Sequence, residues 1–111
     1  MNILIVNPYE DLLYEKEKLV KSKYPESNIV KYTNPMLAVK YAANNKIDIL
    51  FTRIDMAICN GYQVADLVVK FNKSVKVYFE REWGIGNFLT MGKGNQMIKW
   101  ENKYILNCVG C

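Results

Sequence analysis

The sequence predicts a three-layer α/β domain in which helices cover both faces of a parallel β-sheet. Short apolar, β-branched segments alternate with amphipathic segments of helical periodicity, and the connections between them are short. This alternation is typical of βαβ units with right-handed crossovers. Residues 47–54 are apolar along nearly their whole length, as expected for a central strand covered on both faces. The chain has 111 residues, so we expect residues 1–111 to form a single domain.

The first predicted pair is a strand at residues 2–6 and a helix at residues 10–24. The strand is apolar and β-branched and ends at Asn7-Pro8, a turn signal. The helix has acidic residues in its first turn and basic residues in its last, which suits the helix dipole. We expect its core face to carry Leu12, Leu13, Leu19 and Val20.

The second pair is a strand at residues 28–32 and a helix that starts at Pro35. Proline is favoured at the first helical position, and Thr33 or Asn34 can cap the helix. Asn44-Asn45 ends it.

After the third strand, the pattern predicts a helix at residues 61–72 and a fourth strand at residues 75–79. The helix has an apolar face made of Val64, Ala65, Leu67, Val68 and Phe71.

Charge and composition restrict the function classes. The formal net charge is +4, and the lysines are spread along the whole chain among acidic residues. This spread indicates a solvated surface, so we expect no nucleic acid binding by this domain. No apolar stretch approaches the roughly 20 residues of a membrane span, so we expect no membrane partner. The chain has no histidine, which removes the commonest general base and metal ligand.

The three cysteines indicate a reducing compartment. Their number is odd and no signal peptide precedes them, so we expect a cytoplasmic protein. Cys108 and Cys111 form a Cys-x-x-Cys at the chain end, but one such pair is only half of a four-ligand zinc site. We interpret them as two thiols near a terminus.

Residues 47–61 resemble a known functional segment. A buried strand leads into Arg53-Ile54-Asp55-Met56 and then Asn60-Gly61, which is similar to the phosphorylation strand and loop of response-regulator receiver domains of two-component phosphorelays. The resemblance covers residues 2–79 in element order and length. It implies a flavodoxin-like fold with strand order 2-1-3-4-5. It also implies a phospho-acceptor aspartate at the end of the third strand, and Arg53 occupies that position.

Other positions depart from the family pattern. Asn7 and Pro8 stand where receivers carry the acidic pair that binds Mg²⁺. Glu80 stands near the position of the Thr or Ser that binds the phosphoryl group in receivers. Lys99 matches the family lysine, but Trp100 replaces the proline that follows it. A guanidinium offers no lone pair to a phosphoryl group or to a metal. We therefore expect no Mg²⁺, no cofactor and no catalysis.

The resemblance also groups the candidate site residues. Asn7, Arg53, Asp55, Glu80 and Lys99 should lie at the carboxyl edge of the strands. We expect the Arg53 guanidinium to fill the vacated cation site among Asn7, Asp55 and Glu80 or Glu82. Asp55 has the same strand parity as Arg53 and is an alternative phospho-acceptor.

The last third of the chain is irregular. Residues 83–92 are interrupted by glycines and predict a flexible connector, or a short irregular helix. Residues 96–107 predict a hairpin, with a fifth strand and a stunted helix as the alternative. We therefore expect short or missing fourth and fifth helices.

Two functions from different classes remain. The first is a phosphorylation-independent pseudo-receiver that acts in signal transduction or transcription regulation through a protein partner or a homodimer. The second is a small α/β protein that binds an anion or metabolite, or a weak enzyme, with its site at the carboxyl edge of the strands.

Overall fold

The computed structural model describes residues 1–80 and 88–90. Strands and helices alternate along the chain up to the fourth strand, as predicted. The elements are β1 (Asn2–Val6), α1 (Glu10–Lys23), β2 (Asn28–Tyr32), α2 (Pro35–Asn44), β3 (Ile49–Arg53), α3 (Gly61–Phe71), β4 (Lys76–Glu80) and β5 (Phe88–Thr90). The sheet has the order β2-β1-β3-β4-β5, with β1 to β4 all parallel. The predicted flavodoxin-like three-layer fold is confirmed.

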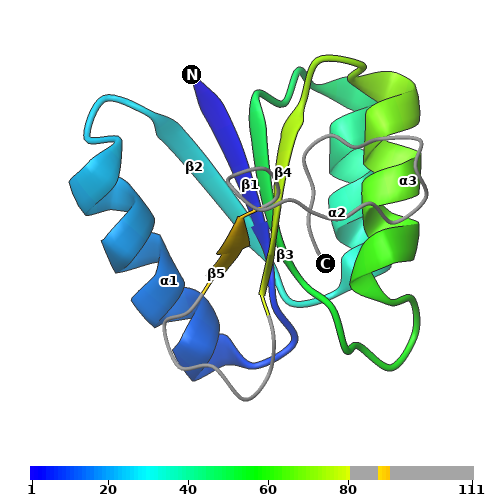
Figure 1. The fold of residues 1–111 in the computed structure, drawn as a ribbon, viewed down its shortest axis with the longest axis horizontal. Coiled ribbons are helices and arrows are strands. Elements are labelled where there is room, and N and C mark those ends of the chain that lie inside the picture. Colours follow the sequence, from blue (N-terminus) through cyan, green and yellow to red (C-terminus); the bar gives the residue numbers. More distant parts are fainter. Residues whose placement is uncertain (81–87, 91–111) are drawn as a thin grey trace.

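Helices cover both faces of the sheet (Figure 1). α1 lies on one face, and α2 and α3 lie side by side on the other. Because side chains alternate along a strand, each strand supplies both cores. The core under α1 contains Ile3, Ile5, Leu13, Val20, Ile49 and Phe51. The core under α2 and α3 contains Leu4, Val6, Ala38, Leu50, Val64, Val68, Val77 and Phe79, among others.

The fifth strand differs from the prediction in place and in direction. Phe88–Thr90 pairs antiparallel with β4, so that Tyr78 faces Thr90. We predicted a connector or an irregular helix across residues 83–92, which is wrong for residues 88–90. A parallel crossover needs about a dozen residues, more than the segment 81–87 provides. The hairpin predicted at residues 96–107, and Cys108 and Cys111, lie outside the described residues.

The core face of α1 also differs from the prediction. Leu13 and Val20 are buried, but Leu12 and Leu19 are 41% and 49% exposed. The third buried residue of the helix is Lys16. Residues 13, 16 and 20 follow the i, i+3, i+7 spacing of a single helical stripe, and this stripe faces the sheet. The two leucines therefore lie on the flanks of the helix.

Asn34 caps α2. Its side-chain oxygen accepts hydrogen bonds from the backbone N–H groups of Met36 and Leu37, at 2.8 and 3.4 Å. Pro35 follows as the first helical residue. The structure thus decides between the two predicted caps in favour of Asn34.

We expect Asn34→Ala to lower the free energy of unfolding by about 1 kcal/mol, because two N–H groups of the first turn lose their acceptor. Thr33→Ala is the matched control, since Thr33 is exposed and precedes the cap. Equilibrium urea denaturation of both variants checks this. An equal loss in both would contradict the assignment of the cap.

Among residues 1–80 and 88–90, we find no helix that combines the length and the apolarity needed to cross a membrane.

Candidate functional site

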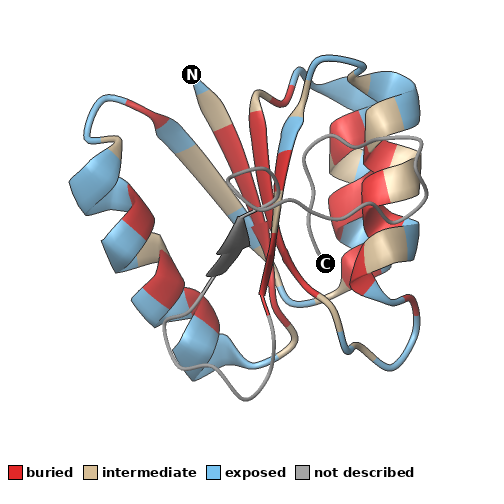
Figure 2. Cartoon of the chain, in the orientation of Figure 1, coloured by how far each residue is buried: buried red, intermediate tan, exposed pale blue. Residues whose placement is uncertain are grey.

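Polar side chains are buried at the carboxyl edge of the sheet, on the face that α1 covers. We call Asn7, Lys16, Arg53 and Glu80 the edge cluster; their exposed fractions are 1%, 3%, 7% and 8%. Three of them follow or end the strands β1, β3 and β4, and Lys16 comes from α1. Arg53 and Glu80 are direct partners in the β3–β4 register. Figure 2 shows the buried stripe of α1 turned toward the sheet.

Asn7 connects the end of β1 to both neighbouring elements. Its backbone N–H donates to the Tyr32 carbonyl at 3.2 Å, which extends the pairing with β2 by one residue. Its side-chain oxygen accepts from the Tyr9 N–H at 3.0 Å and so shapes the turn into α1. Its side-chain nitrogen donates to Glu80 Oε1 at 3.2 Å. Asn7 therefore holds the β1 end against the β4 end.

Lys16 forms an ion pair with the Glu80 carboxylate. Burial lowers the pKa of Lys16 below its usual value, and the charge of Glu80 and its hydrogen bond offset part of that shift. Two buried charges are tolerated only when they are paired and hydrogen-bonded. The Asn7 amide supplies a further hydrogen bond to the same carboxylate. The Lys16–Glu80 pair thus places balanced charges between α1 and the carboxyl edge of the sheet.

Arg53 ends β3 and stacks on an aromatic ring. Its guanidinium carbon lies 4.9 Å from the centre of the Tyr9 ring, within the range of a cation–π contact. Tyr9 is 53% exposed, whereas Arg53 is only 7% exposed. The backbone N–H of Ile54 donates to the Glu80 carbonyl at 3.0 Å and keeps the two strand ends together.

The structure brings only some of the predicted site residues together. Asn7, Arg53 and Glu80 share the edge, and Pro8 is half-buried in the turn before α1. Asp55 is exposed in the loop after β3, and its expected contact with the Arg53 guanidinium stays a prediction. Glu82 and Lys99 lie outside the described residues.

Lys16 is the member of the edge cluster that sequence reasoning missed. The signal was present, because Lys16 is three residues after Leu13 and four before Val20, which places it on the apolar stripe of the helix. A lysine at such a position must bury its ammonium group against an acceptor or extend it to solvent. The structure shows burial with an acceptor.

In the edge cluster, the positive charge comes from the protein's own side chains, Lys16 and Arg53. Hard divalent cations take several oxygen ligands, and Glu80 is the one carboxylate of the cluster. Both of its described partners, the Asn7 amide and the Lys16 ammonium, are donors. Within the described part of the chain, no three His, Cys, Asp or Glu side chains gather at one place.

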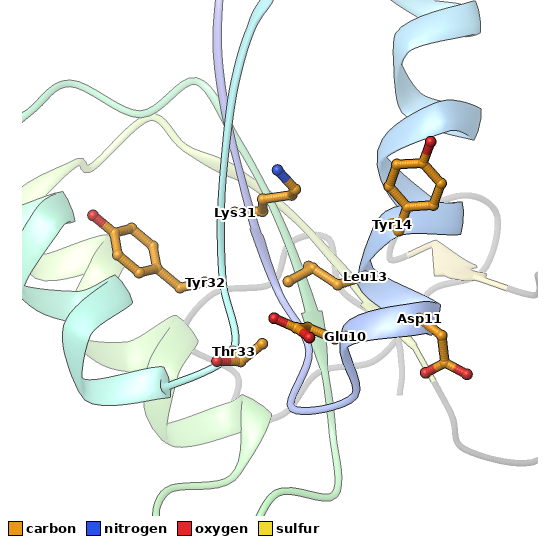
Figure 3. A pocket seen from close by; sticks show the side chains of 7 residues that line it. All are labelled: Glu10, Asp11, Leu13, Tyr14, Lys31, Tyr32 and Thr33. Atoms are coloured by element: carbon orange, nitrogen blue, oxygen red, sulfur yellow. The ribbon is translucent and has the colours of Figure 1, made fainter.

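A separate groove lies beside the edge cluster, between α1 and the end of β2. It has a volume of about 740 Å³ and is lined by Glu10, Asp11, Leu13, Tyr14, Lys31, Tyr32 and Thr33. Figure 3 shows that the α1 residues form one wall and the β2 residues the other. None of the predicted site residues lines this groove.

Comparison with known proteins identifies the fold. No family model matches the chain, and no curated protein matches its sequence. The chain is similar in structure to an uncharacterized protein from Neptuniibacter caesariensis, with a TM-score of 0.62 at 18% sequence identity. The match covers 68% of this chain and 56% of that protein, so the chain spans little more than half of its relative's length. At this identity the likeness supports the α/β fold.

Proposed function

We propose that this chain is a phosphorylation-independent pseudo-receiver that acts in signal transduction or transcription regulation through contacts with a protein partner or a second copy of itself. The observation that supports this proposal is the edge cluster. Phosphoryl transfer to a receiver needs an acceptor oxygen and a bound Mg²⁺. Here a guanidinium stands at the acceptor position, and the neighbouring carboxylate is already paired with the Lys16 ammonium.

A phosphoryl group or metal would have to disrupt this arrangement. A Mg²⁺ ion bound to Glu80 would compete with the Lys16 ammonium for the same carboxylate, and displacing Lys16 would leave a buried ammonium without its counter-charge. Removing one partner of a buried ion pair costs about 3–5 kcal/mol. The edge cluster therefore favours a permanently formed state over a switched one.

Exposed apolar side chains support the protein-contact part of the proposal. Single exposed apolar residues are ordinary, but several arise here from loops and first helical turns at the carboxyl edge. They are Tyr9, Leu12, Met36, Leu37 and Ile58, between 41% and 66% exposed. Helix starts and strand ends meet at this edge in a parallel α/β sheet, so the fold gathers these side chains at one end. Such groups of apolar side chains mark protein-binding surfaces.

The proposal predicts that acetyl phosphate with Mg²⁺ leaves the intact mass of the protein unchanged, and that beryllofluoride with Mg²⁺ does not raise its melting temperature. A phosphorylatable receiver treated in parallel is the positive control. A mass increase of one phosphoryl group would overturn the proposal. If the increase disappeared in Asp55→Asn, the alternative acceptor Asp55 would be identified.

The contact surface is tested by light scattering and partner capture. Ile58→Ser should weaken a homodimer or the capture of a partner at least several-fold, since Ile58 is the most exposed apolar residue of the edge loops. Phe71→Ser is the matched control, because it removes a similarly exposed apolar side chain from the end of α3. Equal effects of both variants would contradict a contact at the carboxyl edge.

The groove between α1 and β2 favours a second candidate function. Its volume of about 740 Å³ suits a small metabolite, and its walls combine two tyrosines with Lys31 and two carboxylates. A thermal shift with a phosphorylated metabolite that is lost in Tyr14→Ala would support binding in this groove.

A further inference from the structure

The amino-terminal edge of the sheet carries a concentrated positive charge. Lysines that are far apart in the sequence meet where α2 and α3 end and where β3 and β4 begin, the upper right of Figure 1. We call Lys46, Lys70, Lys73 and Lys76 the basic corner. All four side chains are exposed.

Asn72 holds the two segments of the basic corner together. Its side-chain oxygen accepts from the Ile47 N–H at 2.9 Å, and its nitrogen donates to the carbonyls of Ala42 and Asn45 at 3.2 and 3.4 Å. The Lys76 N–H also donates to the Asp48 carbonyl at 3.0 Å. These bonds place the segments 44–48 and 70–76 side by side on rigid backbone.

The charge of the basic corner is poorly neutralised. The acidic residue within these two segments is Asp48, and it accepts a hydrogen bond from the Asn2 N–H at 2.7 Å. Its distance to the Lys46 ammonium is 3.9 Å. Four lysines and one aspartate give +3, most of the formal +4 of the whole chain. The α3 dipole favours a positive charge in the last turn of the helix, which explains the presence of Lys70 there. It does not explain Lys46, which lies in a loop, or Lys76, which begins β4.

An exposed aromatic residue belongs to the same segment as three of these lysines. Phe71 is the last residue of α3 and is 51% exposed. We predicted that it faces the core, which is wrong, because α3 buries Val64, Ala65 and Val68 and its last turn extends beyond that stripe. Lys70 precedes Phe71, and Lys73 follows it by two residues.

We propose that the basic corner binds single-stranded nucleic acid, with phosphates on the lysines and a base stacked on Phe71. Positive grooves with aromatic side chains are the usual means of binding single strands without sequence preference. A membrane surface is less suited, since a single exposed ring gives little insertion into lipid. The lysines that indicated a solvated surface when read along the chain form a patch only in the folded protein.

The experiment measures fluorescence anisotropy of labelled oligothymidylate and oligouridylate of about 15 nucleotides in low salt. The expected result is binding that weakens steeply with salt, because each phosphate contact contributes about 0.7 to the slope of log affinity against log salt. Lys46→Gln/Lys73→Gln should lower this slope by about 1.4. Lys18→Gln/Lys23→Gln, an equal change of charge on the exposed side of α1, should leave it unchanged.

Phe71→Leu separates base stacking from attraction by charge alone. It keeps an apolar side chain and all lysines, and it should weaken oligonucleotide binding by at least about 5-fold. Binding of the protein to vesicles that contain anionic lipid is measured in parallel. Binding to vesicles but not to oligonucleotides, absence of oligonucleotide binding in low salt, or equal losses in both lysine variants would each overturn the proposal. The basic corner and the edge cluster lie at opposite edges of the sheet, so this result is independent of the phosphorylation test.

Discussion

Glu80→Leu is expected to lower the free energy of unfolding by about 3–5 kcal/mol. The substitution keeps an apolar side chain in the core but removes the carboxylate that balances the buried Lys16 ammonium. The charge of Glu80 is what limits the lowering of the Lys16 pKa by burial. The buried Asn7 amide would also lose the acceptor of its side-chain N–H. Equilibrium denaturation in guanidinium chloride measures the loss.

The control is the double variant Lys16→Met/Glu80→Leu. Replacing both members of a buried ion pair with apolar residues of similar size is often neutral or stabilising, so the double variant should recover most of the loss. The double-mutant cycle then reports the coupling between the two side chains. A loss below about 1 kcal/mol in Glu80→Leu, the range of surface ion pairs, would contradict a buried pair.

The same pair predicts a pH dependence above neutrality. Burial lowers the pKa of Lys16 below 10.5, so the unfolded chain binds more protons between the lowered pKa and 10.5. The free energy of unfolding due to Lys16 therefore rises with pH in this window. Burial raises the pKa values of Cys59 and Tyr78 and acts in the opposite direction. Those two groups are common to the wild type and the double variant, so the difference between their pH profiles isolates Lys16. A flat difference would contradict the lowered pKa.

Gly61→Ala is expected to lower the free energy of unfolding by about 2–3 kcal/mol. An added Cβ would lie 2.3 Å from the Arg53 carbonyl oxygen and 2.9 Å from the Ile54 Cα. These are backbone atoms at the end of β3 and cannot rotate aside. The Gly61 N–H also donates to the Ile54 carbonyl at 2.8 Å, so the first turn of α3 would have to move away from the strand that carries Arg53.

Asn60→Ala is the control for Gly61→Ala. Asn60 caps α3 in a reciprocal pair of hydrogen bonds with Gln63, each 2.9 Å long, and its loss should cost about 1 kcal/mol without adding an atom near β3. Thermal and chemical denaturation of both variants compare the two effects. A smaller loss in Gly61→Ala than in Asn60→Ala would show that the close approach of α3 and β3 is readily relieved.

Much of the fold could be predicted from the sequence, because the relevant forces act between near neighbours. Helical and strand periodicity, Pro35 at a helix start and Asn7-Pro8 at a strand end placed the first seven elements within a few residues. The parallel order followed from the alternation of these elements. β5 was missed because a three-residue strand among glycines has almost no periodicity, and its pairing depends on the free edge of β4.

The candidate site was only partly predictable. The ends of β1, β3 and β4 had to meet at one edge, so Asn7, Arg53 and Glu80 could be grouped from the sequence. The sequence could not predict which cation balances Glu80, because this depends on the rotation of α1 about its axis. The structure selects the stripe that contains Lys16 and turns Leu12 and Leu19 to the flanks.

The sequence by itself determined the order of strands and helices, the start of α2 at Pro35 and the presence of Arg53 at the end of β3. These features depend on residue type and on spacing within one or two turns. Only the tertiary structure decided that Lys16 pairs with Glu80, that Tyr9 stacks against Arg53 and that the lysines near Asn72 gather at one corner. Each of these contacts depends on how separate elements pack and in which register they pair, and a sequence pattern along one element does not specify its neighbour.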